Sequence, residues 1–218
     1  MRGLFITGTD TNVGKTVVSA ALMHYLRKWG NGCYWKPVQT GIEVDNDTES
    51  VKTLGNCSET EIHDFGYRLR CPVSPHLAAE LSGVHLSIDE ILQKYLPKKN
   101  ATYIVEGAGG LLVPLNEKEL VADLIRAVAL PALIVSRSTL GTINHTVLTI
   151  EALRSRSIDI AGIIMVGEKN QQNRRAIEFY GGVCVVGEMP HFESLSSERL
   201  SDWALQDMDK EEFLKKFL

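Results

Sequence analysis

The stretch that decides the fold of this chain is Gly8-Thr9-Asp10-Thr11-Asn12-Val13-Gly14-Lys15-Thr16. An apolar run of strand length, residues 4–7, precedes it, and residues 15–29 carry apolar side chains at helical spacing. A loop in this setting points backbone N–H groups and the positive end of a helix dipole at one place, which is typical of phosphate binding. Lys15 is expected to reach the outer phosphates of a nucleoside triphosphate, and the Thr16 hydroxyl to hold Mg²⁺.

The glycines of this loop depart from the usual spacing. The Walker pattern places its first glycine five residues before the second, where this chain has Thr9, and Gly8 stands one residue earlier. A glycine-rich turn that merely caps a helix is the alternative interpretation.

Strand-length apolar runs alternate with helical spacing along the rest of the chain, which predicts an α/β fold. Buried strands are expected at residues 4–7, 33–36, 103–106, 132–136, 160–166 and 183–187. Helices are expected at 15–29, 120–130, 142–156 and 170–180, and Ser87 with Glu90 has the spacing of a capping box that opens a helix through Tyr95. We expect one domain over residues 1–218, a mostly parallel sheet flanked by helices as in P-loop NTPases, with residues 45–86 as its least regular insertion.

Composition and charge exclude several other classes of protein. The chain has 218 residues, and its 44% hydrophobic content excludes a disordered protein. Because 27 acidic residues outnumber 23 Lys and Arg, there is no overall basic field to hold nucleic acid. No apolar run approaches the roughly 18–20 residues of a membrane-spanning helix, and no signal peptide is apparent, so we expect a cytoplasmic protein. The 4 dispersed cysteines are expected to be reduced thiols.

Charged residues stand at the ends of two predicted strands. Lys36 ends the second strand, and Glu106 ends the third and precedes several glycines. Open α/β folds place ligands at this edge, which favours Lys36 as a functional cation and Glu106 as a Walker-B-type ligand of Mg²⁺. Either Asp45 or Asp47 is expected to complete the metal shell, since Mg²⁺ prefers oxygen ligands. The alternatives are a surface lysine before a turn and a solvated acidic loop.

Five blocks of sequence together resemble the dethiobiotin synthetase family and occur in the family's order: GTDTNVGKT (8–16), KPVQTG (36–41), CPVSPH (71–76), VEGAGG (105–110) and LGTINH (140–145). The resemblance implies a P-loop ligase of biotin synthesis that acts as a cytoplasmic homodimer and uses Mg²⁺ and ATP. It implies closure of the ureido ring of dethiobiotin from 7,8-diaminononanoate and CO₂. A carbamate and a carbamic-phosphoric anhydride are the implied intermediates, and ADP and phosphate are released.

The resemblance also implies the residues of the site. Catalytic roles fall to Lys36, Lys15 and Thr11, and the magnesium ligands are Thr16, Asp47 and Glu106. The implied nucleotide-binding residues are Gly8, Asn12, Val13, Gly14, Lys15, Thr16, Val17, Glu106, Gly107, Ala108, Gly109, Gly167, Glu168 and Pro190. The implied substrate-binding residues are Thr11, Lys36, Thr40 and Gly109, together with Leu140, Gly141, Thr142, Ile143 and Asn144, which the family takes from the partner subunit and which open a helix suited to a carboxylate.

Two regions depart from the family pattern. Members carry Asn-Asp after the strand at 160–166, and the asparagine contacts adenine, whereas this chain has Gly167-Glu168. Base preference therefore stays open. Residues 194–218 match no family pattern, and their role also stays open.

Two rival functions fit parts of the sequence. A P-loop partition or cell-division ATPase would share the fold, and the amphipathic end of the chain, residues 213–218, resembles a membrane anchor. Such switches carry a signature lysine five residues before the P-loop lysine, where this chain has Asp10, so we expect the C-terminus to dock on the core instead. A cobyrinate-amidase type of ligase needs a glutamine-hydrolysing domain, for which 218 residues are too few.

Overall fold

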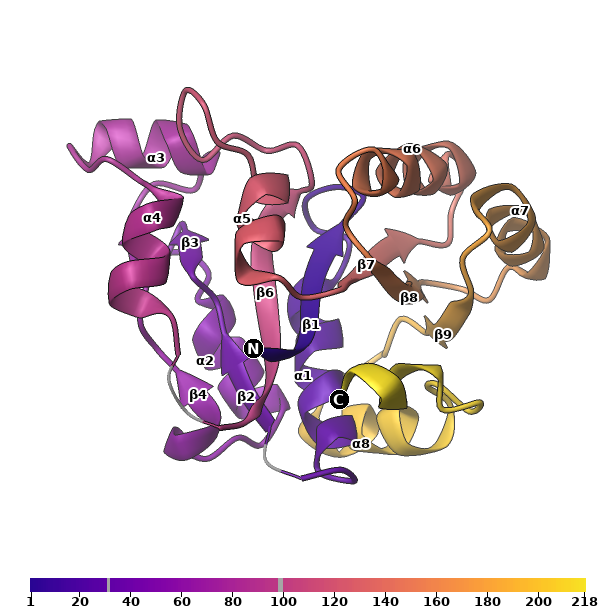
Figure 1. Cartoon of the computed structure of the whole chain (residues 1–218). Helices are drawn as coiled ribbons and strands as arrows, with labels where there is room; N and C mark the ends of the chain where they lie inside the picture. The colour runs from indigo at the N-terminus through magenta and orange to yellow at the C-terminus, as the bar shows by residue number, and fades with distance from the viewer. Residues whose placement is uncertain (31, 98–99) are drawn as a thin grey trace.

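The central layer of the protein is a seven-stranded sheet in the order β4-β2-β6-β1-β7-β8-β9, and every pairing in it is parallel (Figure 1). The computed structural model describes residues 1–30, 32–97 and 100–218. The strands of this sheet are β1 (Arg2–Gly8), β2 (Gly32–Trp35), β4 (Ile62–His63), β6 (Thr102–Gly110), β7 (Ala132–Arg137), β8 (Ile160–Val166) and β9 (Val185–Met189). A second, two-stranded parallel sheet pairs β3 (Val38–Thr40) with β5 (Tyr67–Leu69). The α/β class and the parallel sheet are confirmed.

Helices cover both faces of the large sheet. They are α1 (Lys15–Leu26), α2 (Asp47–Leu54), α3 (Pro75–Leu81), α4 (Ile88–Glu90), α5 (Val121–Val128), α6 (Thr142–Arg154), α7 (Gln171–Gly181) and α8 (Ser197–Gln206), with 3₁₀ turns at Glu59–Glu61 and Phe213–Phe217 and a π-turn at Ile91–Tyr95. Successive strand residues face opposite sides. One face, with Leu4, Ile6, Tyr34 and Ile104, packs against α1, α2, α8 and the C-terminal turn (Figure 1). The other, with Phe5, Trp35, Tyr103 and Val105, packs against the helices from α3 to α7.

Each of the six predicted strands is present, with shifted ends. The strand predicted at 160–166 is β8, and the one predicted at 183–187 is β9, because pairing with β8 begins at Val185. The strand predicted at 103–106 continues to Gly110, so Glu106 lies inside β6 rather than at its tip. The four long predicted helices also form, and each ends within three residues of its predicted C-terminus.

One prediction of local structure, the capping box at Ser87, is wrong. The capping box at Ser87 does not form: its side chain makes no cap hydrogen bond, and the Ile88 N–H donates instead to Glu119 Oε2 at 3.1 Å. The Glu90 carboxylate accepts hydrogen bonds from the Tyr67 hydroxyl at 2.6 Å and from Lys94 Nζ at 2.7 Å. These tertiary partners outcompete the local cap, and the helix is one α-turn followed by a π-turn.

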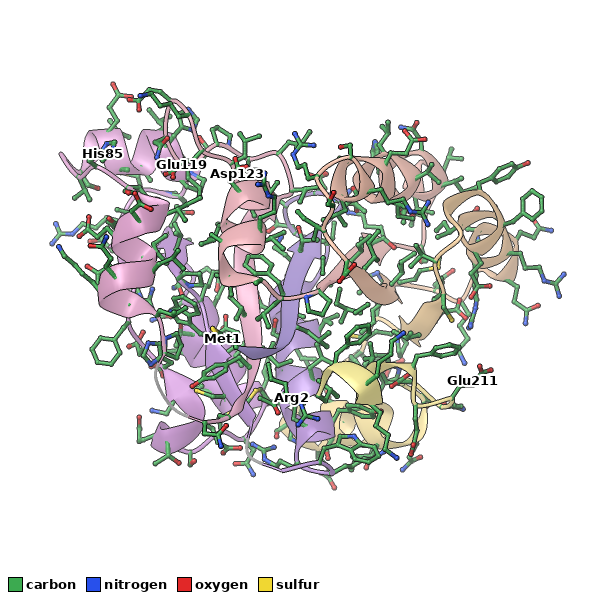
Figure 2. The ribbon with its side chains drawn as sticks, viewed as in Figure 1. Met1, Arg2, His85, Glu119, Asp123 and Glu211 are labelled. Atoms are coloured by element: carbon green, nitrogen blue, oxygen red, sulfur yellow. The ribbon has the colours of Figure 1, made fainter. Side chains whose placement is uncertain are left out.

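The insertion at residues 45–86 is more regular than expected. It holds α2, the two short strands β4 and β5, and α3. Figure 2 shows Glu119 and Asp123 near the start of α5. The Asn116 side chain, which precedes α5, donates to the carbonyl of Leu86 at 2.8 Å and so joins the end of this region to the rest of the domain.

The C-terminus docks on the core, as predicted. Leu214 and Leu218 are buried against the α1 face of the sheet. Asp209 fixes this segment, because its carboxylate accepts from the Tyr25 hydroxyl at 2.8 Å and from the backbone N–H of Phe213 and Leu214. Across the described ranges, no helix is both long and apolar enough to cross a bilayer. Within the same ranges all four cysteines are free of disulfides.

Candidate active site

Two glycines shape the loop between β1 and α1. Gly14 caps α1 at φ 98°, a left-handed conformation that favours glycine. A Cβ on Gly8 would lie 2.8 Å from Asp10 O and 3.1 Å from Lys15 Nζ. Gly8 therefore provides the close approach that the usual pattern assigns one position later. The Lys15 ammonium folds back along the loop and donates to Asp10 O at 3.3 Å, and burial lowers its pKa.

The register of the sheet brings Lys36, which follows β2, next to Glu106 inside β6. Trp35 pairs with Val105, and Ile6 pairs with Glu106, so Lys36 comes level with Glu106 on the neighbouring strand. Glu106 shares the side of Ile104, which is the face covered by α1. The P-loop helix and the two charged side chains therefore meet at one edge of the sheet.

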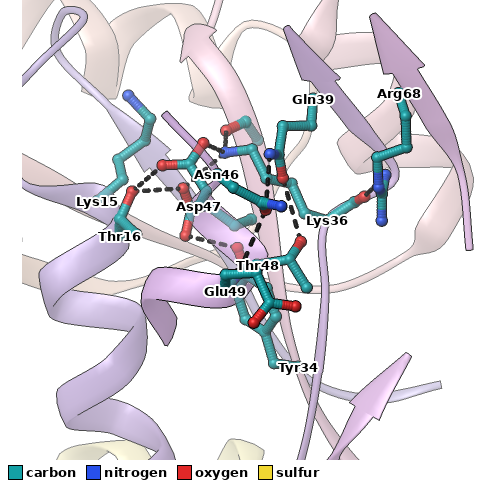
Figure 3. A network of polar contacts seen from close by, with 12 residues as sticks. Lys15, Thr16, Tyr34, Lys36, Gln39, Asn46, Asp47, Thr48, Glu49 and Arg68 are labelled. Carbon is teal, nitrogen blue, oxygen red and sulfur yellow. Dashed lines mark hydrogen bonds and ion pairs between the residues drawn. The ribbon is translucent and has the colours of Figure 1, made fainter. Parts of the chain in front are cut away.

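Lys36 lies between two carboxylates (Figure 3). Its Nζ is 2.7 Å from Glu106 Oε1 and 2.7 Å from Asp47 Oδ2, and it also donates to Gly107 O at 3.4 Å. Lys36 is 3% exposed and Glu106 1%. Burial disfavours the ammonium, but Glu106 and Asp47 outweigh it and raise the pKa of Lys36. Burial also opposes ionisation of Asp47, and there the Lys36 charge prevails and lowers the pKa. Lys36 is thus a buried cation and not a surface lysine.

Thr16 links this ion pair to the P-loop. Its hydroxyl lies 2.5 Å from Asp47 Oδ1 and 3.2 Å from Glu106 Oε1. One hydroxyl and two carboxylates form a set of hard oxygen donors, which fits Mg²⁺. Asp45 lines the same cavity from an exposed position, whereas Asp47 bonds to both Thr16 and Lys36. The geometry therefore favours Asp47 over Asp45 as the third ligand.

Four residues that the sequence did not single out brace these groups. Asn46 caps α2 by accepting from the Glu49 N–H at 3.3 Å, and Gln39 joins Asn46 at 3.0 Å to the Thr48 hydroxyl at 3.1 Å (Figure 3). Asp47 is thereby fixed as the first residue of α2. Arg68 donates to the carbonyl of Lys36 at 2.9 Å. The cap of α2 had a sequence signal in Asn46-Asp47-Thr48-Glu49, but the long-range contacts of Gln39 and Arg68 had none.

A fifth such residue is Tyr34, which is fully buried on β2. Its hydroxyl donates to Glu106 Oε2 at 3.1 Å. Burial and the Glu106 charge raise the pKa of Tyr34 well above its ordinary value, so the phenol stays a donor.

A cavity of about 790 Å³ opens over the charged cluster. Most of the predicted site residues share it: Thr11, Asn12, Gly14, Lys15, Thr16, Val17, Lys36, Thr40, Asp47, Glu106, Ala108 and Gly109. Pro72, Val73, Ser74 and Pro75 from the insertion complete one wall. One cavity therefore brings together the P-loop, Lys36, Glu106 and a wall of the insertion.

A second cavity of about 370 Å³ adjoins the other side of the P-loop. Its lining includes the predicted residues Asn12, Val13, Gly14, Val17 and Pro190, together with Val166, Met189 and Phe192, which were not predicted. Gly167 and Glu168 are not among the lining residues. Gly167 has φ 130°, and a Cβ there would lie 2.3 Å from Ser138 Oγ, so close packing accounts for this glycine.

The predicted substrate segment, residues 140–144, lies outside both cavities of this chain. Gly141 caps α6 at φ 93°, and Leu140 before it is fully exposed. Within one chain, this helix start does not meet Lys36.

Similarity to known proteins identifies the family of this chain. A family described as an AAA domain matches residues 2–199. The ATP-dependent dethiobiotin synthetase BioD of Brucella ovis is 45% identical over 197 residues, which is 90% of this chain and 90% of that protein. The same enzyme from Brucella abortus is 45% identical over the same shares of both chains. The chain belongs to the ATP-dependent dethiobiotin synthetase family. It is an enzyme of that family, as the resemblance of its motifs predicted.

Solved structures support the fold. The cell-division ATPase MinD of Pyrococcus furiosus has a TM-score of 0.57 at 15% identity and covers 100% of both chains. A ParA family ATPase from Chlorobium tepidum has a TM-score of 0.53 at 11% identity, over 94% of this chain and 98% of that one. These identities show the P-loop NTPase fold alone. Asp10, at the place of the signature lysine of such switches, accepts from the Thr11 N–H at 2.7 Å and lies 3.7 Å from Arg137.

Proposed function

We propose that this chain is the ligase that closes the ureido ring of dethiobiotin from 7,8-diaminononanoate, CO₂ and ATP, with release of ADP and phosphate. The observation that carries the proposal is that Lys36, a buried ammonium, shares one cavity with Lys15 and Thr16 of the P-loop. A P-loop alone indicates only that a nucleoside triphosphate binds. A second fixed cation beside it provides for a second anionic reactant.

Carbamate formation is the first step. One amine of the diamine attacks CO₂, forms an N–C bond and loses a proton, which leaves a carbamate anion. This anion reverts readily unless positive charge and donors hold it. Lys36 and Thr11 line the cavity together and serve this role.

Phosphoryl transfer is the second step. A carbamate oxygen attacks the γ-phosphorus of ATP, and the bond to ADP breaks, which gives a carbamic-phosphoric anhydride. Lys15 neutralises charge that would otherwise oppose the approach of two anions. Thr16, Asp47 and Glu106 would hold Mg²⁺, which supplies further neutralisation of the phosphates.

Ring closure is the third step. The neighbouring amine attacks the carbamoyl carbon and loses a proton, so that the second C–N bond forms while the C–O bond to phosphate breaks and phosphate leaves. The step gains from holding both amines in one geometry, because it becomes effectively unimolecular. No side chain acts as a covalent nucleophile in this sequence of steps.

The carboxylate of the substrate tail needs an anion site outside the phosphate loop. The N–H groups at the start of α6, around Gly141, Thr142, Ile143 and Asn144, suit a carboxylate. Since this segment lies outside the cavity of its own chain, we propose that it reaches the site of a partner subunit in a homodimer. The exposed Leu140 is consistent with a position at such an interface.

The nucleotide base is proposed to occupy the second cavity, beside Val17 and Pro190. This cavity shares Asn12, Gly14 and Val17 with the first one, but Lys36 is not among its lining residues, which suits a base whose phosphates lie in the first cavity. We propose a cytoplasmic location for the enzyme, where ATP and bicarbonate are available.

The test is direct. Purified protein with 7,8-diaminononanoate, bicarbonate and MgATP is expected to yield dethiobiotin by mass detection, together with ADP. Omission of any of the three substrates is expected to abolish the product. ADP release with no dethiobiotin would contradict the proposal.

A further inference from the structure

The two oxygens of Glu106 are held from opposite directions. Oε1 accepts from Lys36 Nζ at 2.7 Å and from the Thr16 hydroxyl at 3.2 Å, and it therefore faces the P-loop and the cavity. Oε2 accepts from the Tyr34 hydroxyl at 3.1 Å, on the buried side. Tyr34 is thus the donor on the oxygen that the P-loop and Lys36 do not use.

We propose that Tyr34 is a positioning residue for the nucleotide reaction, because it fixes the rotation of the Glu106 carboxylate about its last bond. The inference rests on the proposed function, in which Glu106 and Thr16 share a magnesium ion. Tyr34 itself touches no substrate, since it lies outside the lining of the cavity. Its contribution passes through Glu106.

The geometry gives the reason for this role. Without the hydroxyl, Oε2 loses its hydrogen bond on the buried side, and the carboxylate is freer to rotate toward the adjacent Lys36 ammonium. Lys36 then competes with Thr16 and the metal for both oxygens. Second-layer donors of this kind orient metal-binding carboxylates, and their loss typically weakens metal binding or activity about 10- to 100-fold.

The protein contains a matched control. Tyr25 on α1 is also a buried tyrosine, and its hydroxyl donates to a carboxylate, Asp209 Oδ2, at 2.8 Å. That pair fixes the C-terminal segment and lies in neither cavity next to the P-loop. Tyr25→Phe therefore removes the same chemical group and the same type of hydrogen bond outside the site.

The experiment measures binding of a non-hydrolysable ATP analogue by calorimetry as a function of Mg²⁺ concentration, without diamine. Tyr34→Phe is expected to raise the Mg²⁺ concentration needed for half-maximal binding about 10- to 100-fold, and to leave metal-free nucleotide binding unchanged. Tyr25→Phe is expected to match the parent in both measurements. Urea unfolding of each variant reports the structural contribution of the hydroxyl separately.

Three outcomes would overturn the proposal. The first is a Mg²⁺ concentration for half-maximal binding by Tyr34→Phe that lies within about twofold of the parent's value, since smaller differences are not resolved by such comparisons. An equal shift in Tyr25→Phe is another, because it would trace the effect to stability. The third outcome concerns a Glu106→Ala background. There, Tyr34→Phe is expected to cause no further change in the Mg²⁺ dependence of binding, and a full effect would contradict the proposal.

Failure of the proposed function would look different. The calorimetry needs no diamine. It therefore tests the effect of Tyr34 on Mg²⁺-dependent binding independently of whether the parent forms dethiobiotin. Where the parent does form it, the kcat of Tyr34→Phe at moderate Mg²⁺ is expected to recover as Mg²⁺ is raised.

Discussion

Replacement of Lys36 by methionine separates the structural and chemical roles of the buried ammonium. The Lys36 side chain is 4% exposed, and that of Glu106, at 2.7 Å, is 1% exposed. Removal of one partner of such a pair costs about 3–5 kcal/mol, because the other charge stays buried without compensation. Thr16 and Tyr34 still donate to Glu106, and Asp47 is 22% exposed, so we expect the lower end, about 3 kcal/mol.

Urea unfolding at pH 7 measures this loss, and in a chain of this size it corresponds to a fall in Tm of about 6–12 °C. The double variant Lys36→Met with Glu106→Gln is expected to regain most of the stability, since a neutral amide needs no counter-charge. Ring closure is expected to stay lost in both. Lys52→Met is the control, because Lys52 pairs with the exposed Glu59 at the surface, and its stability is expected to match the parent.

Two results would refute this reasoning. A Lys36→Met variant within about 0.5 kcal/mol of the parent would mean that the ammonium does not compensate the carboxylates. Dethiobiotin formation by the double variant would mean that Lys36 serves the fold and not the carbamate.

Three further predictions address the rest of the site. Lys15→Ala is expected to lower ring closure by more than about tenfold, or 1.4 kcal/mol, and a smaller loss in kcat/KM would remove Lys15 from phosphoryl transfer. Mixed dimers of Lys36→Ala and Asn144→Ala subunits are expected to regain part of the activity that each homodimer lacks, and inactive heterodimers would contradict a shared site. Because Val17 and Val166 give the proposed base cavity apolar walls, kcat/KM for ATP, GTP and CTP is expected to agree within about a hundredfold, and a greater preference for ATP would indicate a specific adenine contact.

Six strands of the large sheet could be predicted because they are mostly buried and therefore appear as apolar runs. The strands of the insertion could not, since β4 has two residues and β5 three, too few for any periodicity. Helix α8 escaped recognition although Ser196 caps it through the Arg199 N–H and Leu200, Trp203 and Ala204 form its buried side. Its short apolar face packs against α1, which is far away in the sequence, so the local sequence does not show that this face is buried.

Within the site, the grouping of the P-loop, Lys36 and Glu106 could be predicted, because their motifs are local and neighbouring parallel strands bring them to one edge of the sheet. Asp47 was named through the family resemblance, whereas the residues alone left Asp45 open, because the distinction depends on how the cap of α2 orients the loop. Tyr34 resembled an ordinary core residue, since only the register of β2 against β6 places its hydroxyl next to Glu106. The lining of the proposed base cavity also could not be predicted. Val166 lines it, whereas Gly167, the residue singled out from the motif, packs against Ser138.

If one cavity joins phosphoryl transfer to a carbamate held by Lys36, an oxygen atom passes from bicarbonate to the released phosphate. To test this, protein supplied with diaminononanoate, MgATP and bicarbonate labelled with ¹⁸O is sampled at early times, and phosphate and dethiobiotin are examined by mass spectrometry. Each phosphate released with dethiobiotin is expected to carry an ¹⁸O atom from the carbamate, and the new ring carbonyl is expected to keep the other. Dethiobiotin formed together with unlabelled phosphate would contradict attack of the carbamate on ATP.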